Sequence, residues 1–268
     1  MPFAHTTLTH GPSDVEYLVR GSGPGVVLVH GTFADAEGNW ADLIDALADR
    51  YTVLAPNYAG SGATTAPTEV SVTDLAQQVL AAADHAGLET FHLAGHSLGA
   101  VTAAALAGLH PERVNSLVLH APWAVTRPRG ATMFSLWLDL LRTDRPALAR
   151  LLPLTAMRPE TMAQWTPAEM AATVAAFEGM IAERHAVQVT ADRDADIREL
   201  LPRITAPTRV LVSAHDQMIP PAGQREVAAA VRGAETVEFE AGHALPLEDA
   251  NGFSKAITEF FDQIGHTA

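Results

Sequence analysis

Five residues, Gly95-His96-Ser97-Leu98-Gly99, have the G-x-S-x-G spacing that presents a serine nucleophile. An apolar run typical of a strand, residues 90–94, precedes them, and an alanine-rich run typical of a helix, residues 100–109, follows. A sharp turn from strand to helix leaves the serine hydroxyl exposed, and glycines at both ends let the helix pack close to the strand. The pattern predicts that Ser97 is a nucleophile on such a turn.

A serine hydroxyl becomes a good nucleophile only beside a general base, and the base needs a carboxylate that fixes its tautomer. Turns of this type are followed along the chain first by the acid and then by the histidine. Here a strand-like run that ends at Val212 is followed by Asp216, and another that ends at Phe239 is followed by His243. We therefore expect Asp216 and His243 to complete a catalytic set with Ser97.

A fourth part of the chemistry is predicted near the N-terminus. The continuous apolar run 26–29 is typical of a strand buried on both faces, and His30-Gly31-Thr32-Phe33 follows it. The loop after this strand should supply one backbone N–H to the oxyanion of an acyl-transfer intermediate, and the residue after the nucleophile the other. We expect the donors to be Thr32, with Phe33 as the alternative, and Leu98.

Together these segments resemble the α/β-hydrolase family. The resemblance rests on the His30-Gly31 loop, the Gly95–Gly99 turn, Asp216 and His243, and it weakens between residues 123 and 200. It implies the α/β-hydrolase fold, a mostly parallel eight-stranded sheet flanked by helices, with an all-helical cap inserted over the active site. Residues 1–121 and 201–268 are expected to form the core, and residues 122–200 the cap.

The order of apolar and polar segments predicts the elements that position these residues. Strand-like and helix-like segments alternate, which favours a parallel sheet whose ligands bind at the carboxyl ends of the strands. The expected strands are 6–9 and 15–19, an antiparallel pair turned at Gly11-Pro12, and then 26–29, 52–55, 90–93, 116–119, 209–212 and 236–239. The expected helices are 40–49, 72–86, 98–109, 222–231 and 254–264.

The alternation stops between residues 122 and 200, where apolar residues recur at helical spacing in 133–141 and 167–185. In a cap, such residues would build a wide hydrophobic pocket. The side chains expected to line it are Phe33, His120, Trp123, Phe134, Trp137 and Trp165, although packing explains His120 and Trp123 equally well. The acidic stretch 192–196 lacks the glycine and distal glutamate of a calcium loop, so we expect a solvated linker there and no metal site.

Composition limits the partners and the compartment. The chain has 268 residues, a net charge of −14 and no cysteine. The negative charge disfavours nucleic acid and anionic membranes as partners, and the lack of thiols excludes disulfides and thiolate metal sites. The N-terminus shows no signal-peptide pattern and no apolar run is long enough to span a membrane, so a cytoplasmic protein is expected.

The leading functional hypothesis is a serine hydrolase that cleaves a carboxylic ester, lactone or thioester of a bulky hydrophobic substrate through an acyl-enzyme on Ser97. This chemistry requires no metal or organic cofactor. Two alternatives keep the fold and change the reaction: hydrolysis of a carbon–carbon bond, and cofactor-free perhydrolysis of the haloperoxidase type. A ligand-binding protein with this fold is the non-enzymatic alternative. The sequence leaves the oligomeric state open.

Overall fold

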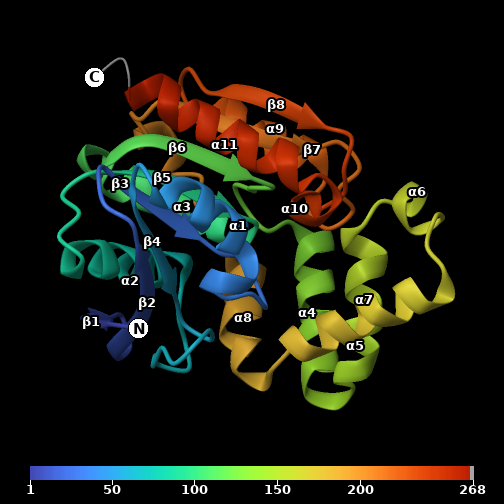
Figure 1. The fold of residues 1–268 in the computed structure, drawn as a ribbon. Helices are drawn as coiled ribbons and strands as arrows, with labels where there is room; N and C mark the ends of the chain where they lie inside the picture. Colours follow the sequence, from blue (N-terminus) through green and yellow to red (C-terminus); the bar gives the residue numbers. More distant parts are fainter. Residues whose placement is uncertain (266–268) are drawn as a thin grey trace.

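The computed structural model describes residues 1–265, which fold around one mostly parallel sheet (Figure 1). Over these residues, eight strands lie in the order β1-β2-β4-β3-β5-β6-β7-β8. The strands are β1 (Phe3–Leu8), β2 (Gly11–Arg20), β3 (Gly25–Val29), β4 (Thr52–Asn57), β5 (Phe91–His96), β6 (Val114–His120), β7 (Thr208–Ser213) and β8 (Glu235–Phe239). β1 pairs with β2, and β2 with β4, in antiparallel fashion, whereas every other neighbouring pair is parallel. The predicted fold class is confirmed.

The first hairpin differs from the sequence prediction. Gly11 pairs with Leu8 and Pro12 pairs with Thr7, so both lie inside β2 and the turn is Thr9-His10. Proline is tolerated there because β4 pairs only with residues 16–20 of β2, so Pro12 has a neighbouring strand on one side alone. The Gly-Pro pair was therefore a wrong indicator of the turn position.

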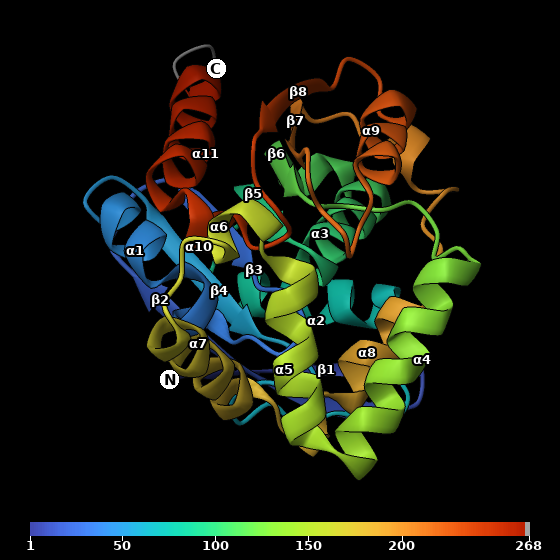
Figure 2. The same cartoon turned by 90° about the vertical axis from the view of Figure 1, so that its right-hand side faces the viewer.

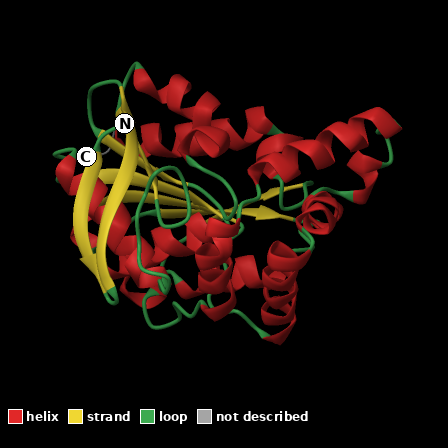
Figure 3. Ribbon diagram, turned by 90° about the horizontal axis from the view of Figure 1, so that it is seen from below, coloured by secondary structure: helices red, strands yellow, loops and turns green. Residues whose placement is uncertain are grey.

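Helices cover both faces of the sheet (Figure 3). Successive residues of β3 alternate between the two layers: Val26 and Leu28 pack in one hydrophobic cluster, Val27 and Val29 in the other. The first cluster includes α1 (Ala36–Ala48) and α11 (Ala250–Gly265), and the second includes α2 (Val72–His85), α3 (Leu98–Leu109) and α9 (Pro221–Ala230). This period of two is what a strand buried on both faces requires.

Local signals fix where α2 begins and ends. The Ser71 side chain accepts a hydrogen bond from the Asp74 N–H, and the Asp74 carboxylate accepts one from the Ser71 N–H. This reciprocal capping box satisfies two backbone donors that the first turn of a helix leaves without partners. Gly87 follows the last turn with φ +76°, a conformation that favours glycine.

The segment between β6 and β7 holds five α-helices within the described chain: α4 (Pro128–Thr143), α5 (Arg145–Ala156), α6 (Pro159–Met162), α7 (Pro167–Met180) and α8 (Ala186–Asp194). Helices α4, α5 and α7 lie beyond the carboxyl ends of the strands (Figures 1 and 2). The helix predicted over 167–185 ends at Met180. The stretch 192–196 was predicted to be a linker, but its first three residues form the last turn of α8, which ends at Asp194. None of the helices described here combines the length and hydrophobicity that crossing a membrane requires.

Candidate active site

Ser97 lies at a strained turn between β5 and α3. Its backbone has φ 55° and ψ −123°, a conformation that side-chain-bearing residues rarely adopt and that costs on the order of 1–3 kcal/mol. A Cβ added to Gly99 would lie 2.1 Å from the Val29 carbonyl oxygen, and one added to Gly95 would lie 2.2 Å from the Gly99 carbonyl oxygen. Both glycines are therefore required for the close packing of α3 against the sheet that holds this turn.

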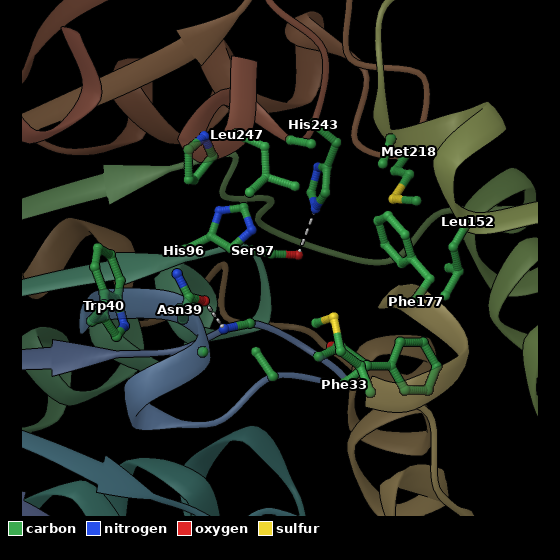
Figure 4. Close-up of a pocket in the computed structure, with 18 of the residues that line it drawn as sticks. Phe33, Asn39, Trp40, His96, Ser97, Leu152, Phe177, Met218, His243 and Leu247 are labelled. Carbon is green, nitrogen blue, oxygen red and sulfur yellow. Dashed lines mark hydrogen bonds between the residues drawn. The ribbon is translucent and has the colours of Figure 1, made fainter. Parts of the chain in front are cut away.

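Three predicted residues meet at the carboxyl ends of their strands. The Ser97 Oγ is 2.9 Å from the His243 Nε2 (Figure 4). The His243 Nδ1 is 2.8 Å from the Asp216 Oδ2. The side chain of His243 is 10% exposed and that of Asp216 is fully buried. In this geometry Nδ1–H donates to the carboxylate, which leaves Nε2 free to accept the serine proton.

The Asp216 carboxylate, in the loop after β7, accepts four hydrogen bonds. Its Oδ1 accepts from the N–H groups of Met218 at 2.9 Å and Ile219 at 2.8 Å. Its Oδ2 accepts from the Gln224 Nε2 at 3.0 Å as well as from His243. Because both oxygens are fully engaged, the carboxylate has one orientation, and it fixes the imidazole in turn.

The loop after β3 passes directly beside the serine. A Cβ added to Gly31 would lie 3.3 Å from the Ser97 Cβ, and the Gly31 N–H donates to the Asn39 Oδ1 at 2.9 Å (Figure 4). The next N–H, that of Thr32, forms no hydrogen bond within residues 1–265, whereas the Phe33 N–H donates to the Gln188 Oε1 at 3.0 Å. Phe33 is thus occupied, and Thr32 keeps a backbone donor available.

Leu98 is the first residue of α3, so its N–H has no acceptor one turn earlier in the helix. The positive end of the helix dipole lies at the same point. Both features suit the binding of a developing negative charge next to Ser97. The pair Thr32 and Leu98 stays a prediction.

A cavity of about 480 Å³ opens above Ser97 and His243. Figure 4 shows Leu152, Phe177 and Met218 on the side of the cavity opposite His96 and Leu247. Most of the lining side chains are apolar. Of the six side chains expected to line a pocket, three line this one: Phe33, Phe134 and Trp137.

The other three expected pocket residues lie elsewhere. His120 is buried behind His96. Trp123 lines a second cavity of about 270 Å³, and its Nε1 donates to the Thr126 Oγ1 at 2.8 Å. Trp165 follows α6 and packs, partly buried, against the hydrophobic core. The sequence alone could not separate these three side chains from those that line the cavity above Ser97.

Several lining residues were not predicted, and one of them was assigned to the wrong environment. Asp192, predicted to lie in a solvated linker, is 1% exposed, lines the cavity above Ser97 and accepts a hydrogen bond from the Thr32 hydroxyl at 2.7 Å. The linker prediction was wrong because an acidic run is exposed to solvent only where no other segment packs against it, and the Thr32 loop packs against Asp192. No local signal in the sequence places the Thr32 loop against α8.

Two further histidines form a buried chain beneath the site. The His96 Nδ1 is 2.7 Å from the His120 Nδ1, and the His120 Nε2 is 2.9 Å from the Ser213 Oγ. Burial lowers the pKa of both rings well below the ordinary value, and the neighbouring His243 lowers it further. Both rings are therefore neutral at pH 7, and one nitrogen of the Nδ1 pair must carry the shared proton.

Burial also lowers the pKa of His30 and of His185, in each case to about 4. A histidine with a lowered pKa in the folded state stabilises the fold above its ordinary pKa, and this stability is lost as the pH falls toward the folded-state value. We therefore expect the free energy of unfolding to fall from pH 6.5 toward pH 4, by at most about 1.4 kcal/mol per pH unit for each such histidine.

Urea unfolding at pH 7.5 and at pH 5 measures this loss. Replacing His185 with glutamine should reduce the difference between the two free energies. Equal stability of the unmodified protein at the two pH values would show that the buried rings do not resist protonation.

The chain matches the model of a known protein family and is similar to several known proteins. The model of the alpha/beta hydrolase fold family matches residues 24–250. A "Pyrrolizixenacetamide deacetylase" of Xenorhabdus hominickii is 37% identical over 253 residues, which cover 93% of this chain and 95% of that protein.

Two solved structures are also similar. The enol-lactonase from Burkholderia xenovorans LB400 has a TM-score of 0.83 at 26% identity and covers 96% of this chain and 99% of its own. A thermophilic esterase from Thermogutta terrifontis has a TM-score of 0.85 at 24% identity and covers 98% of each chain, a likeness of fold alone. With a family model matched over most of its length, the chain belongs to the α/β-hydrolase fold family.

Proposed function

We propose that this protein is a serine hydrolase that cleaves an acyl bond in a small, largely apolar substrate. The observation that carries the proposal is the hydrogen-bonded row of Asp216, His243 and Ser97, which opens into a cavity of about 480 Å³. A nucleophile, a base and an orienting carboxylate in contact are the arrangement that activates a serine hydroxyl. The apolar lining of the cavity supports a hydrophobic acyl or leaving group.

The mechanism follows from the positions of the protons. The His243 Nε2 takes the Ser97 proton as the Oγ attacks the carbonyl carbon, and Asp216 stabilises the resulting imidazolium. The N–H groups of Thr32 and Leu98 bind the oxyanion of the tetrahedral intermediate. His243 then gives its proton to the leaving group, and an acyl-enzyme remains on Ser97. Water, deprotonated by His243, attacks the acyl-enzyme and releases the acid.

The helices between β6 and β7 are proposed to act as a cap, corresponding to residues 122–200. Four of them contribute lining side chains to the cavity: Phe134 and Trp137 from α4, Leu152 from α5, Phe177 from α7, and Asp192 from α8. The nucleophile, base and acid come from the sheet. Changes in the cap would therefore alter which substrate binds while leaving the acyl-transfer chemistry in place.

The acyl bond itself has two candidates. A carboxylic ester, including a lactone or thioester, is the first, because its leaving group departs readily from a tetrahedral intermediate. An amide is the second, and the relative named a deacetylase favours it. The same residues serve both bonds, but an amine leaves only after protonation, so an amide substrate depends more strongly on the imidazolium of His243.

Stopped-flow assays with p-nitrophenyl esters of increasing acyl length, and with the matching p-nitroanilides, test the proposal. We expect an initial burst of nitrophenol of about one equivalent per protein, followed by a slower steady rate, because nitrophenol is a good leaving group and acylation is then faster than deacylation. Turnover of the anilides at a comparable efficiency would favour the amide. Absence of both burst and turnover at every chain length would contradict the proposed function.

A further inference from the structure

A second buried carboxyl lies beside the proposed oxyanion loop and takes no part in the Asp216–His243–Ser97 row. The Asp192 Oδ2 accepts a hydrogen bond from the Thr32 Oγ1 at 2.7 Å, and the residue is 1% exposed. Its Oδ1 is buried and has no hydrogen-bond partner within residues 1–265. A buried aspartate with one oxygen that has no hydrogen-bond partner is costly to fold. Its position next to the loop that would bind the oxyanion therefore indicates a functional role.

A neighbouring side chain of α8 holds the same loop. Gln188 lies four residues before Asp192, one turn away on the same face of the helix. Its Oε1 accepts from the Phe33 N–H at 3.0 Å, and its Nε2 donates to the Ala59 carbonyl at 2.9 Å and to the Ser61 Oγ at 2.8 Å. Phe33 has φ 65°, so this loop is strained and depends on its surroundings for its shape.

Nothing compensates a charge on Asp192. Within the described chain no arginine, lysine or histidine forms an ion pair with it, and its helix neighbours Arg193 and Asp194 pair with each other on the surface. The titratable group that faces it from the loop after β4 is the buried Tyr58, whose pKa is raised by burial and by Asp192. Burial raises the pKa of Asp192 itself to about 8, against the lowering effect of the Thr32 hydrogen bond.

We propose that Asp192 is a positioning residue, which as a neutral carboxyl holds Thr32 so that the Thr32 N–H can meet the oxyanion. An ionised carboxylate would still accept a hydrogen bond from the Thr32 hydroxyl. Its negative charge, however, would lie next to the residue that binds the developing oxyanion, and the two charges would repel each other. Gln188 holds the next residue of the loop, Phe33. Two side chains of α8 therefore fix the conformation of the loop after β3. This inference rests on the proposed serine hydrolase function.

The measurable consequence is a loss of rate at alkaline pH. As Asp192 ionises above about pH 8, the rate of Ser97 acylation should fall. Replacing Asp192 with asparagine keeps an oxygen acceptor for Thr32 but cannot ionise. This variant should lose the alkaline fall in the rate.

The rate constant for labelling of Ser97 by a fluorophosphonate, followed by intact-protein mass from about pH 6 to about pH 10, measures this directly. Asp192→Leu and, should that variant fail to fold, Thr32→Val should label at least about tenfold more slowly, because either change frees the loop. Asp194→Asn, on the same helix and exposed, is the matched control and should follow the unmodified profile.

An infrared spectrum adds a readout that does not depend on activity. At pH 6.5 the unmodified protein should show the C=O band of a protonated carboxyl, and Asp192→Asn should lack it. An identical alkaline fall in Asp192→Asn, or labelling rates unaffected by Asp192→Leu and Thr32→Val, would overturn the inference. Failure of the unmodified protein to label at Ser97 at any pH would instead overturn the proposed function.

Discussion

Replacing Ser97 with alanine should lower kcat toward p-nitrophenyl esters by about 10⁵-fold or more, with little effect on stability. The reason lies in the contacts of the hydroxyl: its Oγ is 2.9 Å from the His243 Nε2, and no other hydroxyl is hydrogen-bonded to that nitrogen within the described chain. Removing it leaves the proposed oxyanion donors and the cavity intact, which would account for any residual rate above that in water. Steady-state kinetics of the purified variant measure the loss.

Ser135→Ala, on α4 and outside the cavity lining, is the matched control and should retain the unmodified kcat. Circular dichroism and the thermal midpoint of both variants should match those of the unmodified protein. Full activity in Ser97→Ala would show that the ester is cleaved by another group.

Replacing Asp216 with asparagine should lower kcat by about 10⁴-fold. The amide nitrogen of asparagine accepts no hydrogen bond, so in the place of the Asp216 Oδ2 it would meet two donors, the Gln224 Nε2 at 3.0 Å and the His243 Nδ1 at 2.8 Å. The imidazole would then adopt the wrong tautomer, or lose its orienting partner and the charge that stabilises the imidazolium. The loss should appear in kcat rather than in KM, because the substrate cavity does not change.

Asp194→Asn is again the appropriate control, since it changes the charge of an exposed aspartate by the same amount. A loss for Asp216→Asn of less than about tenfold would mean that the carboxylate is structural and that another residue orients the base.

The central residues were predictable from the sequence because the relevant physics is local. Gly95 and Gly99 lie two positions before and two positions after Ser97 in the sequence. Asp216 and His243 each follow a short apolar strand. Parallel strands bring their carboxyl ends to one edge, so the order of elements predicts a meeting point even before the distances are known.

The surroundings of the site were not predictable in the same way. Whether an aromatic side chain in the helical segment lines the cavity depends on how α4, α5 and α7 pack against one another. The sequence therefore could not separate Phe134 and Trp137, which line the cavity, from Trp165, which does not. Asp192 shows the same limit for a charged residue, because its burial arises from a contact with Thr32, 160 positions away.

The measurement that tests the central claim most directly is the mass of the protein quenched in acid during turnover of a p-nitrophenyl ester. The account predicts one acyl group per chain, located by peptide mapping on the segment Gly95–Gly99 and absent from Ser97→Ala. Turnover of the ester without any covalent adduct, or with an adduct on a different segment, would contradict it.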